Sequence, residues 1–244
     1  LLIDQQFLSR LAGNREKTMH RARFQVLIVI YAAEALIAST DSRAATLHTD
    51  DFSLGQAGWM SGGAVVSLEP DGGPTGAADP FLRVRPGFTN LAVFNSAPDW
   101  TGNYADLGAD RVEVDLLAAA GTSPLSIRLV LFGPGTQPPT TATTQYTSTA
   151  AAELPADGQW RRFIFSLAEA DLTRVRGTQS YAAMMSNVLR VMFRHDPGAP
   201  SSGGTGVDGD LGIDNVALLG PSLTTGDYDG DFDVDGVDFL RWQR

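Results

Sequence analysis

The stretch NVLRVMFR, residues 187–194, shows the pattern that decides the fold. Its apolar side chains alternate with others, so that Leu189, Val191 and Phe193 fall on one side of an extended chain. RRFIFSL, residues 161–167, repeats this alternation. Because successive side chains of a strand point to opposite faces, a period of two predicts strands that turn one face to a core.

Further short apolar segments follow one another between Thr46 and Gly220, separated by clusters of Gly, Pro, Asp and Ser. Many short strands divided by turn residues are typical of an antiparallel sandwich or barrel. One short helix is predicted, Tyr181–Met185. The predicted strands are Ala64–Leu68, Phe81–Arg85, Leu91–Asn95, Arg111–Leu117, Ser126–Phe132, Trp160–Leu167, Val188–Arg194 and Leu211–Leu218.

The composition limits the kind of protein. A chain of 244 residues with 43% hydrophobic content suits one main domain with additional segments. The net charge of −10 argues against nucleic acid or an anionic membrane as a partner and favours cations. The chain has no cysteine, which excludes disulfides, thiol catalysis and sites with cysteine ligands.

The N-terminal region has the parts of a secretory signal. MHRAR, which begins at Met19, is basic, the apolar run FQVLIVIYAAEALIA covers residues 24–38, and small residues follow. The run is shorter than the ~20 residues that span a bilayer and contains Glu34. We expect residues 1–45 to be an upstream segment and signal peptide, and the mature chain to be secreted or at the cell surface without a membrane span. A buried helix is the alternative.

The order of several short phrases resembles a known fold. These phrases are TDDFS at residues 49–53, DGQWRRFIFSLAEADL at 157–172, NVLRVMFR, and LGIDNVALLG at 211–220. Together they resemble the galactose-binding-like jelly rolls of non-catalytic carbohydrate-binding modules and their laminin-IV-like relatives. The resemblance implies an all-β, antiparallel jelly-roll β-sandwich over residues 46–220, and a polysaccharide or glycan as partner.

The same resemblance implies a calcium ion where the first strand meets the last. Asp50, Asp51 and Asp214 stand at the matching positions. Ca²⁺ takes 6–8 oxygen ligands, which these carboxylates and backbone carbonyls could supply. The alternative is that the three residues cap turns or face solvent.

Glycan binding also needs exposed aromatic side chains that stack on sugar faces. Trp100 and Tyr104 are the best candidates, because they lie in APDWTGNY, whose polar residues indicate a loop. Burial of both rings in the core is the alternative.

No motif indicates catalysis. The sequence contains no nucleophile elbow, zinc-protease motif, phosphate-binding loop or dinucleotide fingerprint, and outside the predicted signal its histidines are His48 and His195. We therefore expect no catalytic residues. A hydrolase whose two carboxylates meet only in the folded chain is the alternative.

The acidic segment GDYDGDFDVDGVDF, residues 226–239, has the spacing of an EF-hand calcium loop. Phe232 stands where that loop has glycine, and the twelfth place holds Asp in place of Glu. Apolar residues that continue to Trp242 predict a following helix. Counted from the first place of the loop, the predicted ligands are Asp227, Asp229, Asp231, Asp233, through its backbone carbonyl, Asp235 and Asp238.

This loop and helix resemble a type I dockerin repeat, which implies a cohesin-like scaffold protein as a further partner. Residues 221–225 form the expected linker and 226–244 the repeat. Dockerins carry two repeats and this sequence shows one, so we expect an incomplete module. The alternatives are a calcium motif without cohesin recognition and a disordered acidic tail.

The leading hypothesis is a secreted, non-catalytic, calcium-binding protein with a carbohydrate-binding-module-like sandwich and a dockerin-like tail. Its role would be glycan binding or assembly on an extracellular scaffold. The alternatives are a cell-surface adhesion or matrix protein and a polysaccharide hydrolase.

Overall fold

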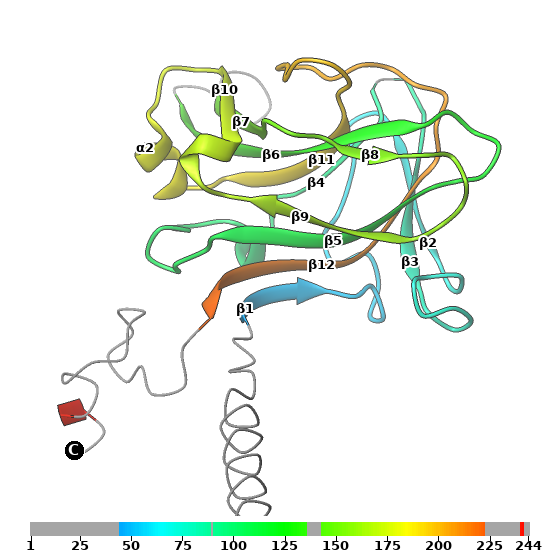
Figure 1. Cartoon of the computed structure of the whole chain (residues 1–244), viewed down its shortest axis with the longest axis horizontal. Coiled ribbons are helices and arrows are strands. Elements are labelled where there is room, and N and C mark those ends of the chain that lie inside the picture. The colour runs from blue at the N-terminus through cyan, green and yellow to red at the C-terminus, as the bar shows by residue number, and fades with distance from the viewer. Residues whose placement is uncertain (1–43, 89, 136–142, 223–239, 242–244) are drawn as a thin grey trace, which may run out of the picture. The chain divides into compact units, whose positions relative to one another are not determined.

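Two antiparallel sheets, stacked face to face, make up this protein in a computed structural model (Figure 1). The structure describes residues 44–88, 90–135, 143–222 and 240–241. Residues Ala44–Ser222 form one unit. Most of the predicted signal and the whole predicted calcium loop lie outside the described residues, and both stay predictions.

The lower layer in Figure 1, here named the β12 sheet, is built around the long strand β12. One edge of β12 pairs along its length with β5, while its other edge is shared by β3 and then β1. All of these pairs are antiparallel. The strands, in sheet order, are β2 (Val65–Glu69), β3 (Phe81–Arg85), β12 (Leu211–Ser222), β5 (Arg111–Ala118) and β9 (Arg161–Ser166), with β1 (Ala44–Asp50) beside β12.

The upper layer, here named the β11 sheet, has the same plan. β11 lies between β6 and β4, and β6 shares its other edge between β7 and β8. The strands, in sheet order, are β10 (Leu172–Arg176), β7 (Thr143–Ser148), β6 (Leu125–Gly135), β11 (Arg190–His195) and β4 (Ala92–Asn95), with β8 (Ala152–Leu154) beside β6.

Three short helical turns connect these strands: η1 (Pro98–Trp100), η2 (Glu169–Asp171) and α2 (Tyr181–Met185). Ser180 caps α2, since its hydroxyl accepts the Ala183 N–H at 3.2 Å. Gly133 lets α2 lie close to β6, because a Cβ at that position would be 2.6 Å from the Met184 Cγ. Among the described residues, no helix is long and apolar enough to span a membrane.

The predicted all-β sandwich is confirmed. All eight predicted strands are present, with bounds that differ from the prediction by at most four residues at either end, and β3 and α2 have the predicted bounds. Four strands of the structure, β1, β7, β8 and β10, are absent from the predicted set. β8 has three residues and β10 reads LTRVR, so neither shows an apolar alternation long enough to recognise.

The core lies between the sheets and is filled by the alternate side chains of both. Val191 and Phe193 of β11 are fully buried in it, as the alternation predicts. Leu189 precedes β11 and is only half-buried. Phe193 stacks on Trp59 with 5.6 Å between ring centroids and lies 5.9 Å from Phe165, which belongs to the opposite sheet.

A buried carboxylate organises one end of this core. Asp50 ends β1, and its Oδ2 accepts indole N–H bonds from both Trp59 and Trp100, each at 2.7 Å. Its Oδ1 lies 3.1 Å from the Nε2 of His48. Asp50 and the two tryptophans are almost completely buried, so few other acceptors could replace this carboxylate. The cluster ties β1 to two loop segments that have no ladder of their own.

We predict that Asp50→Ala lowers the free energy of unfolding by about 2–5 kcal/mol, because two buried indole N–H groups lose their acceptor. Urea unfolding followed by tryptophan fluorescence measures this change. Asp157→Ala is the control, since it removes an exposed ion pair with Arg161 and an exposed hydrogen bond from the Gln159 N–H, and should leave stability nearly unchanged. Equal effects of the two substitutions would contradict the role given to Asp50.

Candidate functional site

A hollow of about 390 Å³ lies on the outer face of the β11 sheet, here named the cleft. Side chains of β4, β6, β7, β10 and β11 line its floor, and the loops at residues 61–63 and 202–203 form part of its wall. The pleat of β11 explains this placement. Since Val191 and Phe193 point into the core, Arg190, Met192 and Arg194 point outward into the cleft.

The strand register places one row of side chains across the floor of the cleft. Arg176 of β10 is opposite Gln145 of β7, Gln145 is opposite Phe132 of β6, and Phe132 is opposite Arg190 of β11. Phe94 of β4 lies in the next row, opposite Met192. The floor therefore mixes cationic, amide and aromatic groups that come from five different strands.

Arg190 lies over the aromatic rings of this floor. Its guanidinium carbon is 3.8 Å from the centroid of Phe94 and 5.4 Å from that of Phe132. Its Nε donates to the Ser96 hydroxyl at 3.0 Å. Burial lowers the pKa of Arg190, and among the described residues no carboxylate lies within ion-pair distance to offset that effect. The cation–π contacts hold the side chain flat against the floor.

Two buried polar atoms of the cleft have no hydrogen-bond partner among the described residues. They are the Oε1 of Gln145, a residue that is 5% exposed, and the Nε of Arg194, a residue that is 3% exposed. The rest of the Arg194 guanidinium is held by the Ser201 and Ser202 carbonyls and by Asp196. Because buried polar groups in proteins are nearly always paired, one unpaired acceptor and one unpaired donor in one hollow indicate a place for a ligand or for water.

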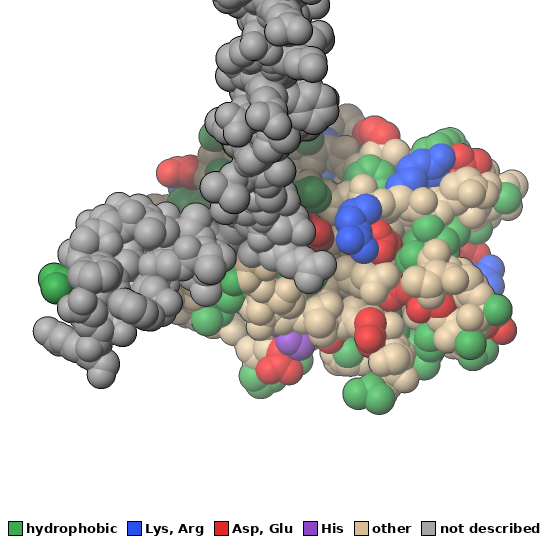
Figure 2. Space-filling view, turned by 60° about the horizontal axis from the view of Figure 1, so that its bottom comes forward, with side chains coloured by type: hydrophobic (Ala, Val, Ile, Leu, Met, Phe, Trp, Pro, Cys, Tyr) green, Lys and Arg blue, Asp and Glu red, His purple; other side chains and the backbone are tan. Residues whose placement is uncertain are grey.

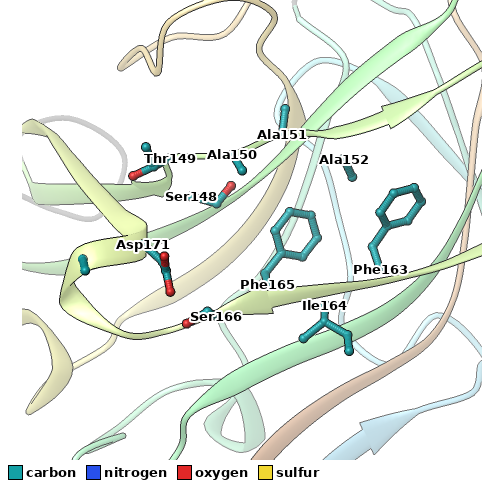
Figure 3. A pocket seen from close by; sticks show the side chains of 11 residues that line it. Ser148, Thr149, Ala150, Ala151, Ala152, Phe163, Ile164, Phe165, Ser166 and Asp171 are labelled. Carbon is teal, nitrogen blue, oxygen red and sulfur yellow. The ribbon is translucent and has the colours of Figure 1, made fainter.

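A second hollow, of about 380 Å³, opens between the two sheets near β8 and β9 (Figure 3). Phe163, Phe165 and Ile164 of β9 lie on one side of it, and the alanines at positions 150–152 lie opposite. Asp171 is the charged residue on its rim. This hollow carries no unpaired buried polar atom among the described residues, so it offers a ligand less specific recognition than the cleft does.

Trp100 and Tyr104 do not belong to either hollow. Both side chains are completely buried, and the expectation that they are exposed is wrong. Trp100 donates its indole N–H to Asp50, and the Tyr104 hydroxyl donates to the Trp100 carbonyl at 2.9 Å. Burial raises the pKa of Tyr104, as expected for a phenol inside the core. Their polar neighbours indicate irregular backbone correctly, but irregular backbone does not mean that a side chain is exposed.

The acidic residues predicted for calcium are separated by the structure into different roles. Both oxygens of Asp50 already accept hydrogen bonds or face His48, and Asp51 is exposed with its Oδ1 bonded to Ser53. Asp214 is completely buried, and its Oδ2 has no hydrogen-bond partner in the described parts of the chain. Among the described residues, no three acidic or histidine side chains are gathered as a ready metal site. The predicted ligands Asp227–Asp238 lie outside the described residues.

The surroundings of Asp214 nevertheless suit a cation. The pKa of Asp214 is raised to about 7, mainly by burial, with a smaller contribution from the nearby charges of Asp79, Asp115 and Asp51, while the hydrogen bond from the Asn215 N–H acts in the opposite direction. The next residue, Asn215, has a φ of +48° at an irregularity in the pairing of β12 with β5. An unpaired buried carboxylate close to other carboxylates is a group whose charge a bound Ca²⁺ would offset.

The two described histidines, His48 and His195, have structural partners in this fold. His195 is 6% exposed, and its Nδ1 accepts the Ser126 N–H at 3.1 Å, so no carboxylate orients that nitrogen. Burial lowers the pKa of His195. His48 lies against Asp50 and Trp100. Neither arrangement matches a nucleophile, base and orienting acid.

The sequence pattern predicts β11 but not the cleft. The apolar side of NVLRVMFR indicates the strand, while its other side carries Arg190, Met192 and Arg194, which line the cleft. Large cationic and apolar side chains on the outer face of a central strand were the available signal. Gln145 and Arg176 gave none, because only the folded register brings Gln145 beside Phe132 and Arg176 beside Gln145.

We predict that Gln145→Leu leaves the free energy of unfolding unchanged or raises it by about 1 kcal/mol, because it removes an unpaired buried acceptor. Thr147→Val is the matched control on the same strand and face. The Thr147 hydroxyl donates to the Leu129 carbonyl at 3.1 Å, so its loss should cost about 1 kcal/mol. Chemical unfolding checks both, and a larger loss for Gln145→Leu than for Thr147→Val would show that Gln145 is needed for folding.

Three solved structures share this fold with a TM-score of 0.50 each. The solution structure of CtCBM11, a carbohydrate-binding module (CBM), is 18% identical over 75% of this chain and 98% of that chain. The CBM22-1–CBM22-2 tandem domain of Xyn10C from Paenibacillus barcinonensis is 14% identical over 75% of this chain and 47% of that one. An exo-beta-agarase is 12% identical over 71% and 25%.

No protein-family model and no curated protein sequence matches the chain. At identities below 20% the likeness concerns the fold alone. The chain thus has the two-sheet β-sandwich fold of carbohydrate-binding modules.

Proposed function

We propose that this chain is a secreted, non-catalytic module that binds a polysaccharide in the cleft on the β11 sheet. The observation that carries the proposal is the pair of unpaired buried atoms, Gln145 Oε1 and Arg194 Nε, in one hollow. A sugar hydroxyl donates one hydrogen bond and accepts others, so neighbouring hydroxyls of a glycan would satisfy both atoms. The fold shared with carbohydrate-binding modules supports this reading.

Binding without catalysis agrees with the groups in the cleft. Its charged side chains are arginines, and no Asp or Glu is among the described residues that line it. Glycoside hydrolysis ordinarily requires a pair of carboxyl groups across the sugar ring. A hydrolase active elsewhere in the chain remains the alternative, and product release from a polysaccharide would identify it.

We also propose that Ca²⁺ binds at Asp214, with Asp51 and backbone carbonyls as further ligands. The Ca²⁺ ion would stabilise the fold by offsetting the buried negative charge of Asp214 where β1 meets β12. A second Ca²⁺ would bind the predicted loop of Asp227, Asp229, Asp231, Asp233, Asp235 and Asp238. The resemblance of this loop to a dockerin repeat supports a scaffold protein as its partner.

We predict that the full chain binds a polysaccharide from a panel of neutral and acidic polymers, and that Gln145→Leu weakens the binding about 10-fold or more. The reason is that the variant removes an acceptor that only the ligand satisfies, which is worth at least ~1.4 kcal/mol. Affinity electrophoresis surveys the panel, and calorimetry then measures the dissociation constant.

Ile164→Ala is the control for this experiment, since Ile164 is exposed on the second hollow. It should leave the affinity unchanged. Loss of binding in Ile164→Ala with none in Gln145→Leu would move the site to the second hollow. A fully inert panel would reject the glycan proposal and favour an adhesion protein.

We predict that Ca²⁺ raises the melting temperature and that Asp214→Asn abolishes most of that rise. A buried carboxyl with its pKa raised above 3.8 to about 7 stabilises the fold at low pH and loses that contribution as the pH rises through about 7. In chelator at pH 8, Asp214→Asn should therefore be at least as stable as the unmodified chain. Asp157→Asn, at an exposed ion pair, is the control.

A full calcium response in Asp214→Asn would place the stabilising ion elsewhere. The predicted loop is tested separately in the full chain by calorimetry of Asp227→Ala/Asp238→Ala. This double variant should bind one Ca²⁺ fewer, and an unchanged stoichiometry would remove the loop from the proposal.

A further inference from the structure

The charge of the cleft is opposite in sign to the charge of the chain. Arg176, Arg190 and Arg194 line it, and none of the described lining residues is acidic. The whole chain has a net charge of −10. On the face shown in Figure 2, acidic and basic side chains lie interspersed. The cleft is therefore a local concentration of positive charge on an acidic protein.

The aromatic rings of the cleft do not offer a free face to a neutral sugar. Phe94 and Phe132 both lie beneath the Arg190 guanidinium, at 3.8 and 5.4 Å from its central carbon. No tryptophan or tyrosine is among the described residues that line the cleft. A ligand that enters therefore meets a planar cation in place of an aromatic platform. A guanidinium held flat in this way suits paired hydrogen bonds to a carboxylate or sulfate.

The three arginines differ in how far protein carboxylates neutralise them. In the described parts of the chain, neither Arg190 nor Arg176 has an ion-pair partner. Arg190 donates a hydrogen bond to the Ser96 hydroxyl, and Arg176 is exposed. Arg194 contacts Asp196, but Arg128 lies 3.9 Å from the same carboxylate. These two arginines therefore share one negative charge, and the group keeps a net positive charge. Every arginine of the cleft can thus attract an anion.

The spacing of the cations favours a polymer over a small anion. Arg176 and Arg190 stand in one row across four strands, which separates their backbones by roughly 14 Å at ~4.8 Å for each strand interval. Arg194 follows Arg190 by four residues along β11, which adds about 13 Å in the other direction. A single phosphate or sulfate could not bridge such positions. A chain with anionic groups at intervals could.

Taking the proposed glycan-binding function as its basis, we propose that the cleft selects an acidic polysaccharide, which carries carboxylate or sulfate groups along its chain, over a neutral one. The arginines would bind the anionic groups. Between these groups, the Gln145 Oε1 would accept a hydrogen bond from a sugar hydroxyl, and the Arg194 Nε–H would donate one to a hydroxyl or ring oxygen. Non-specific attraction cannot produce this preference, because the net charge of the protein repels a polyanion.

The test compares the full chain on four soluble polymers: polygalacturonate and alginate, which carry carboxylates, carrageenan, which carries sulfates, and neutral xylan. We expect at least one acidic polymer to bind about 10-fold or more tightly than xylan, with a further weakening of about 10-fold between about 25 and 300 mM NaCl. Comparing the affinities for the two carboxylate polymers with the affinity for carrageenan shows whether the cleft prefers carboxylate or sulfate groups.

Arg176→Gln and Arg190→Gln should each weaken binding of the acidic polymer about 10-fold while any xylan binding stays unchanged. Arg176 is exposed, so its variant keeps the test valid if Arg190→Gln does not fold. Arg174→Gln is the matched control on the same strand, since Arg174 is exposed, bonds to the Thr178 and Gln179 carbonyls and points to the other face.

The outcomes separate the two proposals. Acidic selectivity would be overturned if xylan bound as tightly as the acidic polymers or more tightly. If Gln145→Leu weakened this xylan binding and salt did not, the glycan-binding function would stand. Acidic binding that Arg174→Gln weakens as much as Arg176→Gln would also overturn it. Absence of binding to every polymer of the panel would reject the glycan-binding function itself.

Discussion

The pleat of β11 is the constraint on which both the core and the cleft depend. β11 is paired on both edges, with β6 on one side and β4 on the other, so its register is fixed along its length. Val191 and Phe193 fill the core, and Arg190, Met192 and Arg194 form the floor of the cleft. A slip by one residue would turn the arginines toward the core and the apolar residues toward the cleft, which makes the register strongly specified.

The cleft reduces stability, and other parts of the fold compensate. Gln145 and Arg194 keep unpaired polar atoms in buried positions, and Arg190 is partly desolvated without a carboxylate partner. Such groups are unfavourable in the free protein and become favourable only when a ligand pairs with them. The Asp50 cluster acts in the opposite way, because it satisfies every buried indole N–H at its end of the core. Binding groups and stabilising groups are thus kept apart in the sandwich.

Sequence reasoning predicted the fold well because period-two alternation is a local signal. It placed β3, β5, β11 and α2 nearly to the residue, but found no signal for the three residues of β8. The cleft depends on cross-strand neighbours such as Gln145 and Phe132, which lie 13 positions apart in the chain, and on Arg176 and Arg190 from two further strands. Composition could not bring these residues together. The burial of Trp100 could not be predicted, because its indole N–H donates to Asp50 and nothing in the sequence links Asp50 to a tryptophan 50 positions away.

The central claim is that a glycan binds over β11. An NMR titration of the full chain with a soluble fragment of the polysaccharide that it binds, observing the arginine Nε–H and the backbone amide signals, tests this claim most directly. We predict large shifts for Arg176, Arg190 and Arg194, with small ones for Arg83 and Arg161, which pair with Asp210 and Asp157 away from the cleft. Shifts that spare the three cleft arginines and gather around Ile164 in the second hollow would contradict the account.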